Sequence, residues 1–184
     1  MKSERRSQNQ EPGTLNPSLS KIGFMAPTTP YSSDLGARDP ILAMRESAAR
    51  YRAIAGNWSP AQFELSYGPG KWTARQVLIH LAQTELALGT RARMALATPN
   101  YVAQNFDQNA WVAFERGLSG RDALDVFLAL VAMNRSLFES LSPAERATPL
   151  AHPEYGALSV DWILHQIAGH EIHHLPQLEA IDKL

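Results

Sequence analysis

The sequence GHEIHHLPQ, at residues 169–177, places three of the six histidines of the chain within five residues. Side chains four residues apart share one face of an α-helix, so His170 and His174 can direct their rings toward a single point. Two imidazoles on one helix, joined by a third ligand from elsewhere in the chain, form a metal site that keeps open coordination positions. The segment therefore predicts a metal-binding helix.

The two histidines also lie on the apolar face of that helix. At about 100° per residue, they fall within the stripe formed by Ile163, Ile167, Leu178 and Ile181. A buried polar group without a partner costs about 1–3 kcal/mol. One histidine on such a face is typical of a hydrogen-bonded core residue, whereas two, one turn apart, favour a metal.

The composition is that of a globular protein without unusual charge. Apolar residues make up 45% of the 184 residues, and the formal net charge of -1 argues against nucleic acid as the main partner. The chain has no cysteine, which excludes disulfides, thiolate ligands and a cysteine nucleophile. Apolar runs are shorter than the roughly 18 residues of a membrane span, and a signal-peptide core is missing. We therefore expect a cytoplasmic protein that does not act at a membrane.

Residues 1–38 differ in composition from the rest of the chain. They are rich in charged residues, Gln, Asn, Ser and Pro, and the stretch APTTP at residues 26–30 continues this character. Such a composition predicts a disordered tail, with Met25 as an alternative start of the protein. The folded domain is then expected at residues 39–184.

Helical periodicity and capping signals recur through this domain. Four long helices are predicted, each beginning after an N-cap residue: Asp39, Thr73, Ser119 and Ser159. The chain contains no alternating strand pattern, and a short helix is expected at residues 108–117. The predicted fold class is all-α, a four-helix bundle with short extra helices in its connections.

A third histidine lies on the second predicted helix. His80 is on the inner edge of the apolar stripe of that helix, where a lone histidine is most often a core or boundary residue. Bundles bind metals between facing helices, and there His80 would meet His170 and His174. His80 is therefore the candidate third ligand.

Two segments of the sequence resemble the DinB/YfiT-like superfamily of metal-dependent enzymes. GKWT at residues 70–73, VLIHL at residues 77–81 and then Glu85 resemble the entry into the second helix of that family. IAGHEIHHLPQ at residues 167–177 resembles its final helix, although Pro176 departs from the pattern. The similarity extends over residues 40–182.

The resemblance implies a four-helix bundle, often a homodimer, with one divalent metal. Its ligands in this chain would be His80, His170 and His174, and zinc, nickel and ferrous iron all accept imidazole. Characterised relatives include transferases and isomerases that use low-molecular-weight thiols as cofactors. The resemblance alone does not define a substrate.

The segment HEIHH, at residues 170–174, also matches the H-E-x-x-H helix of zinc proteases. Proteases of this kind usually take their third ligand downstream, whereas only ten residues follow His174. The sequence also lacks strands that could bind an extended peptide, so a protease is disfavoured. Glu171 remains a candidate general base, or else a solvent-exposed carboxylate on the helix.

Two classes of function follow. The first is a metal-dependent enzyme that acts on a small molecule, either a low-molecular-weight-thiol S-transferase or a hydrolase. Because the chain has no cysteine, the thiol would be a soluble cofactor. The second is a non-catalytic scaffold of the stress-response type, metal-binding or metal-free, that acts through dimerisation. An open coordination position above the metal would favour the enzyme.

Overall fold

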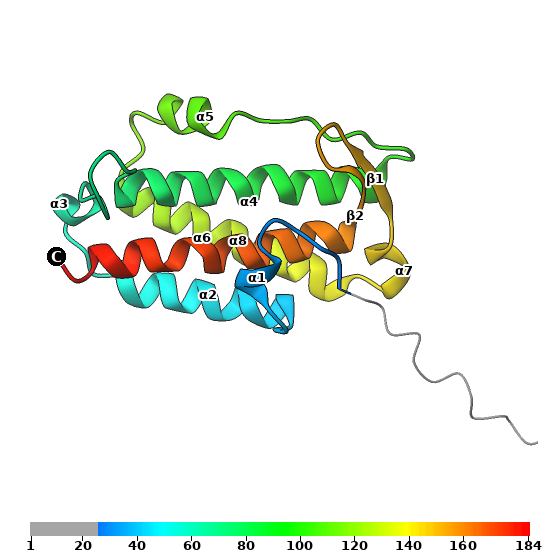
Figure 1. Cartoon of the computed structure of the whole chain (residues 1–184), viewed down its shortest axis with the longest axis horizontal. Coiled ribbons are helices and arrows are strands. Elements are labelled where there is room, and N and C mark those ends of the chain that lie inside the picture. Colours follow the sequence, from blue (N-terminus) through cyan, green and yellow to red (C-terminus); the bar gives the residue numbers. More distant parts are fainter. Residues whose placement is uncertain (1–25) are drawn as a thin grey trace, which may run out of the picture.

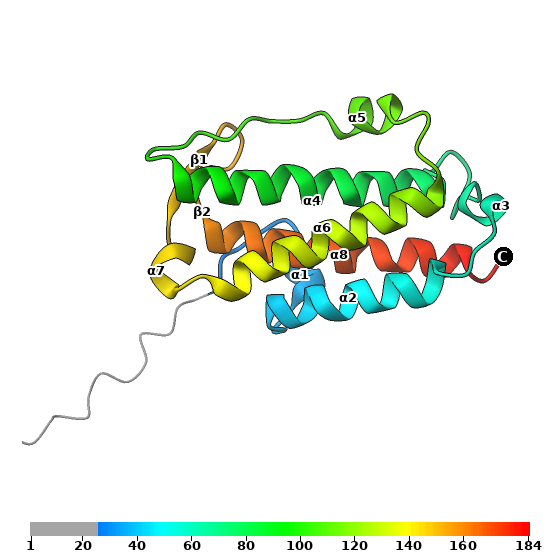
Figure 2. The same cartoon turned by 180° about the vertical axis from the view of Figure 1, so that it is seen from behind.

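Four long helices run along a common axis in the computed structural model, which describes residues 26–184 (Figures 1 and 2). They are α2 (Pro40–Ala55), α4 (Ala74–Ala97), α6 (Gly120–Ser140) and α8 (Val160–Ile181). Helix α4 packs against α6 and α8, and α2 packs against the same two helices. The predicted four-helix bundle is confirmed. None of the helices in this part of the chain is long and apolar enough to cross a membrane.

Among the described residues, the N-terminal segment carries one short helix, and the connections between the long helices carry three more and one hairpin. The helices are α1 (Ser32–Leu35), α3 (Pro60–Phe63), α5 (Gln108–Phe114) and α7 (Pro143–Arg146). Strands β1 (Pro149–His152) and β2 (Gly156–Ser159) pair in antiparallel register. The sequence shows no alternating pattern over this hairpin, because four-residue strands are too short to produce one.

The predicted N-caps are present at all four long helices. The side chains of Asp39, Thr73, Ser119 and Ser159 each accept a hydrogen bond from a backbone N–H in the first turn of their helix. Each bond satisfies one of the backbone donors that a helix leaves without an internal partner. The helix starts were therefore predictable from local sequence.

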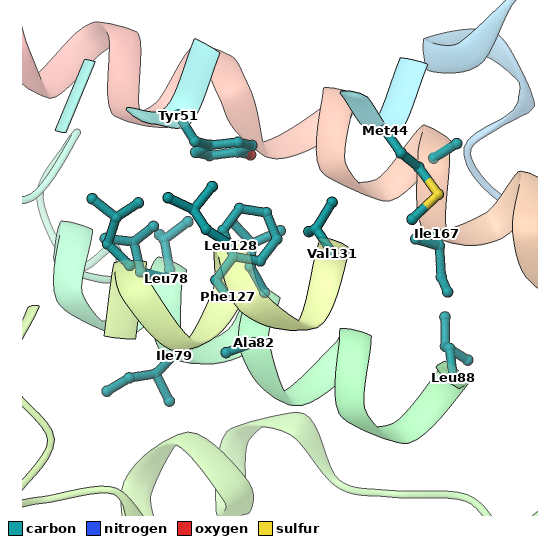
Figure 3. Packing of buried hydrophobic residues seen from close by; sticks show 14 of the residues in the cluster. Met44, Tyr51, Leu78, Ile79, Ala82, Leu88, Phe127, Leu128, Val131 and Ile167 are labelled. Atoms are coloured by element: carbon teal, nitrogen blue, oxygen red, sulfur yellow. The ribbon is translucent and has the colours of Figure 1, made fainter. Parts of the chain in front are cut away.

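Large apolar side chains from all four long helices fill the centre of the bundle (Figure 3). Tyr51 of α2 packs edge-on against Phe127 of α6, with ring centroids 5.0 Å apart. On α8, Ile163, Ile167 and Leu178 are at most 1% exposed. Full burial of such a side chain stabilises the fold by about 1.5–3 kcal/mol. The apolar stripe predicted for the last helix is the face that enters the core.

Helix α8 continues through Pro176 to Ile181. Proline has no backbone N–H, so the carbonyl of Ile172 lacks its usual helical donor. Leu178 and Ile181, beyond the proline, are both buried. Their packing in the bundle holds the last turns of the helix in place.

Residues 26–38, which we expected to belong to a disordered tail, pack against the bundle instead. The Trp162 indole N–H donates to the carbonyl oxygen of Thr28 at 2.9 Å, and Leu35 is 3% exposed. The short helix α1 lies on α8 (Figure 1). The rest of the predicted tail, residues 1–25, lies outside the described residues.

Candidate metal centre

Helices α4 and α8 bring His80, His170 and His174 together in the bundle. The Nε2 atom of His170 lies 2.9 Å from Nε2 of His80 and 3.0 Å from Nε2 of His174. All three side chains are buried, and their ligand atoms lie within 4.8 Å of one another. The structure thus assembles the three predicted residues, which we call the histidine cluster.

The spacing of these nitrogens suits a shared cation. Nitrogens bound to one ion at about 2.0–2.1 Å lie roughly 3 Å apart. A neutral imidazole has one N–H donor and one acceptor nitrogen, so three converging Nε2 atoms cannot all satisfy one another. The arrangement therefore fits a divalent metal that prefers imidazole ligands.

A neighbouring amide orients one ring of the cluster. The Nδ1 atom of His174 lies 2.9 Å from Oε1 of Gln177, and an amide oxygen can only accept. Nδ1 must then carry the proton, which leaves the Nε2 lone pair facing the cluster. Hydrogen bonds of this kind fix ring orientation and tautomer in metal sites. In the sequence, Gln177 stands out only as part of the segment that resembles the family's final helix.

Burial keeps the three imidazoles neutral. It lowers the pKa of His80 to about 3, with a smaller contribution from His174. It also lowers the pKa of His170 well below its usual range and lowers that of His174. Neutral imidazoles have free lone pairs at physiological pH, which is the state that binds a metal.

A cavity of about 370 Å³ adjoins the cluster and is lined by His80 and His170. Helices α4 and α8 form its floor, and the connection at residues 105–108 and the hairpin turn at residues 152–155 also line it. Tyr31, from the N-terminal segment, completes the wall. The volume is in the range of small-molecule sites.

The N-terminal segment lies directly against the histidine helix. The ring of Tyr31 is 5.1 Å from that of His170 and 5.0 Å from that of His173. A Cβ atom at Gly169 would lie 2.6 Å from the Tyr31 carbonyl oxygen, so only glycine permits this approach. The Nδ1 atom of His173 lies 3.4 Å from the Asp34 carboxylate, which adds a further contact.

A second buried polar group, the acidic cluster, draws one residue from each long helix: Tyr51, Glu85, Asn134 and Glu171. The Asn134 amide donates to Oε2 of Glu85 at 2.8 Å and to its backbone oxygen at 2.9 Å. The Tyr51 hydroxyl donates to the Glu171 carbonyl oxygen at 2.7 Å. All four residues are at most 2% exposed.

The two carboxyl groups of the acidic cluster share a proton. Burial raises the pKa of Glu85 to about 7, and burial together with the charge of Glu85 raises that of Glu171 well above its usual range. The Ser47 hydroxyl donates to Glu171 and favours its ionised form, but this effect is smaller than those of burial and of Glu85. Two ionised carboxylates side by side in the interior would repel each other, so the pair retains a proton.

Glu171 is therefore placed differently from either expectation. It is fully buried rather than exposed on the helix, and it is not among the residues that line the cavity. Its position one residue after His170 turns it by about 100°, toward Glu85. Its role as a general base remains a prediction, and the geometry favours a structural role.

The fold and the site define a helical-bundle protein with a three-histidine cluster beside a cavity. The chain belongs to the DinB superfamily, whose sequence profile matches residues 43–178. The resemblance noted in the two histidine segments is thereby confirmed. The matched region includes the whole histidine cluster and begins after the Tyr31 segment.

Two relatives are similar to this chain in sequence. A protein of Oceanobacillus iheyensis named "Putative metal-dependent hydrolase" is 31% identical over 123 residues, which cover 66% of this chain and 72% of that protein. A Bacillus licheniformis protein with the same description is 25% identical over 144 residues, covering 74% and 80% of the two chains.

Two solved structures have a similar fold. YfiT from Bacillus subtilis, described as "a probable metal-dependent hydrolase with an unusual four-helix bundle topology", aligns with a TM-score of 0.70 at 20% identity, over 78% of this chain and 84% of that chain. A mycothiol-dependent maleylpyruvate isomerase aligns with a TM-score of 0.64 at 16% identity, over 76% and 59% of the two chains. At these identities the similarity concerns the fold.

The sequence did not reveal most of the cavity wall. Tyr31, Arg91, Phe106 and Tyr155 line the cavity but belong to no motif. They come from four separate elements, and only the return of the loops over α4 brings them together. Gln166 of α8 also lies in the cavity wall.

Proposed function

We propose that this protein is a metal-dependent enzyme that transfers a low-molecular-weight thiol to a small electrophilic substrate. The observation that carries the proposal is the open cavity beside three converging Nε2 atoms. A structural metal site is closed, whereas a catalytic one keeps a position for substrate. His80, His170 and His174 would hold the metal.

The metal, when bound, supplies Lewis acidity that lowers the pKa of a thiol and favours the thiolate near neutral pH. The residues of the chain orient the ligands and exclude water. The Gln177 amide holds the His174 ring in its ligating tautomer. The apolar rings of Trp72 and Tyr31, about 5 Å from His80 and His170, shield the site from water. Shielding strengthens the electrostatic interactions within it.

The supply of bases in the cavity favours a thiol over water as nucleophile. Hydrolysis benefits from a general base, and besides the candidate ligands the cavity is lined by Asp107, Glu154 and His152, whose Nδ1 already accepts backbone hydrogen bonds from Glu154 and Tyr155. Asp107 is engaged as the N-cap of α5, and Glu154 lies on the hairpin turn. A thiol has a lower pKa than water and depends less on a base.

Hydrolysis of a small molecule is the second candidate. It is supported by the names of the relatives, which describe metal-dependent hydrolases. Both reactions require the same metal site, so one experiment can test the site and then separate the reactions.

The first step is elemental analysis of the untagged protein by plasma mass spectrometry. We expect about one divalent metal per chain, lost in the variant His170→Ala/His174→Ala. A variant that removes two other histidines of α8, His165→Ala/His173→Ala, should keep the metal. No metal in the native protein after incubation with zinc, nickel or iron would overturn the proposal and support a metal-free scaffold.

The second step compares the two reactions in the metal-loaded protein. In the transfer assay, a thiolate attacks the ring carbon of 1-chloro-2,4-dinitrobenzene, a carbon–sulfur bond forms and chloride leaves. In the hydrolysis assay, 4-nitrophenyl acetate is converted to acetate and nitrophenol. We expect transfer that depends on His170 and His174. Hydrolysis alone, with the same dependence, would replace the first candidate with the second.

A further inference from the structure

The cavity beside the histidine cluster changes in chemical character along its length. Helices α4 and α8 run antiparallel, so their residues face each other in successive turns (Figure 1). One turn beyond the histidines lie Thr84 and Gln166, the next turn holds Leu88 and Trp162, and Arg91 follows on α4. With increasing distance from the histidines, the cavity therefore has a polar layer (Thr84 and Gln166), then an apolar layer (Leu88 and Trp162), and finally the positive charge of Arg91.

The polar layer contains buried oxygens without partners. Within residues 26–184, neither Oγ1 of Thr84 nor Oε1 of Gln166 has a hydrogen-bond partner. Such atoms are rare in folded proteins, because losing water without gaining a partner is unfavourable. Both oxygens can accept a hydrogen bond. A ligand N–H group, such as that of an amide, would give either oxygen its missing partner once the side chain rotates toward the cavity.

Arg91 provides the positive charge at the far end. Its guanidinium group is half-buried, lies over the ring of Phe106 at 5.7 Å and donates one hydrogen bond to the carbonyl oxygen of Gln104. Among the described residues it forms no ion pair, and burial lowers its pKa. A guanidinium with remaining N–H donors binds a carboxylate in a well-defined geometry.

Two carboxylates line the same cavity and affect this choice of ligand. Asp107 accepts two backbone hydrogen bonds as the N-cap of α5, at 2.9 and 3.1 Å, which occupies its Oδ1 atom. Glu154 is exposed on the hairpin turn, near enough for its charge to act on Arg91. Its repulsion should weaken binding of an anion, and that effect can be measured.

The length of the cavity limits the size of the ligand. His80 and Arg91 are 11 residues apart on α4, a rise of roughly 16 Å at 1.5 Å per residue. The arginine side chain tilts toward the start of its helix and shortens this span. A ligand that reaches both ends must therefore be extended, with about 10 Å between its terminal groups.

We propose that the cavity binds an elongated small molecule that carries a thiol at the histidine cluster, an amide N–H at the polar layer and a carboxylate at Arg91. The thiol end rests on the proposed function. The carboxylate end is independent of it, because Arg91 lies far from the metal ligands along α4.

The proposal can be tested with synthetic thiols of graded length. The probes are N-(3-mercaptopropionyl)-ω-amino acids and the corresponding alcohols, in which a hydroxyl replaces the carboxylate. Calorimetry measures the affinity of each probe for the cobalt(II)-loaded protein, and the thiolate-to-cobalt absorption band reports separately whether sulfur binds the metal. We expect the acid to bind at least tenfold more tightly than the alcohol at one chain length, with less preference at shorter lengths.

Variants at the far end of the cavity make the assignment specific. Arg91→Gln should abolish the preference for the acid while the thiolate band remains. Arg91→Lys should retain part of it, and Glu154→Gln should increase it. Arg52→Gln, which removes one exposed positive charge on α2, should leave the preference unchanged. Thermal melting and cobalt content verify that each variant is folded and loaded.

The outcomes separate the two proposals. A thiolate band with equal affinity for acid and alcohol at every length, or a preference that survives in Arg91→Gln, would overturn the carboxylate site and leave the proposed function intact. An Arg91-dependent preference without a thiolate band would uphold the carboxylate site and contradict thiol binding. Absence of binding by every probe would overturn the inference as a whole.

Discussion

The histidine cluster and the two carboxyl groups of the acidic cluster lie on the same two helices, α4 and α8, yet the hydrogen-bonding needs of their polar atoms are met in opposite ways. His170 and Glu171 are even neighbours in the sequence. The histidines direct three nitrogens toward one point beside a cavity. Glu171 and Glu85 instead face each other inside the bundle, within a network that draws on all four long helices.

The difference separates a site from a structural network. A network closed on itself, with Asn134 donating to Glu85 and a shared proton between the carboxyls, needs nothing from outside the chain. Three neutral imidazoles with converging lone pairs are incomplete without a cation. Burial and polarity are common to both clusters, so only the direction of the lone pairs and the adjoining cavity distinguish them.

The largest expected effect is on metal binding by a histidine variant. His80→Ala removes the one ligand supplied by α4 and should weaken metal affinity at least about 100-fold, because two ligands on one helix remain. The free energy of unfolding of the metal-free protein should change little. Competition with a chelating dye measures the affinity. Loss of the fold, rather than of the metal, would show that the two clusters are not functionally distinct.

A variant of the acidic cluster should show the opposite behaviour, a loss of stability without a loss of metal binding. Asn134→Leu removes the donor to Glu85 and the acceptor of an Arg93 hydrogen bond of 2.7 Å. Glu85 and Arg93 then each lose a hydrogen bond to the Asn134 amide, so the free energy of unfolding measured in urea should fall by about 3 kcal/mol. Its folded fraction should still bind about one metal per chain. A loss of metal at full stability would contradict the comparison.

The acidic cluster should also make stability depend on pH. Since the pKa of Glu85 is raised from 4.5 to about 7, its contribution to stability is fully present below about pH 4.5 and is lost as the pH rises through about 7. The metal-free protein should therefore lose about 2 kcal/mol between pH 5 and pH 8 relative to Glu85→Gln, which cannot ionise. Urea unfolding across this range measures the difference, and parallel curves for the two proteins would refute it.

The smallest effect concerns the segment over the histidine helix. Gly169→Ala places a methyl group against Tyr31 and should detach residues 26–38, at a cost of about 1–2 kcal/mol. Gly117→Ala, where a Cβ meets open space, serves as the matched control. Limited proteolysis should cut the segment faster in Gly169→Ala alone. Equal resistance to proteolysis in both variants would mean that the close contact between Gly169 and Tyr31 does not hold residues 26–38 on the bundle.

Local signals in the sequence were sufficient for the bundle and for the three histidines. N-caps such as Thr73 and Ser159 act within one turn of their own helix, so their effect is visible in short stretches of sequence. The positions of His170 and His174 on the apolar stripe follow from helical geometry alone. His80 was less evident, and only the expectation of a bundle connected it with the other two.

Other features depended on contacts between distant segments. The hairpin of β1 and β2 consists of strands too short for a pattern, and it forms by pairing across a turn. Residues 26–38 contain few apolar side chains, but Leu35 and the carbonyl of Thr28 find partners on α8. Arg91 became part of a cavity only because a loop and a hairpin return over α4.

The sequence by itself determined the four helices, their capped starts and the face on which the histidines lie, because backbone hydrogen bonding and helical periodicity act over a few residues. Tertiary structure alone decided that Glu171 meets Glu85 in the interior and that a cavity with Arg91 at its far end adjoins the histidines. Burial, shared protons and cavities depend on contacts between segments far apart in the chain, so a local sequence pattern cannot predict them.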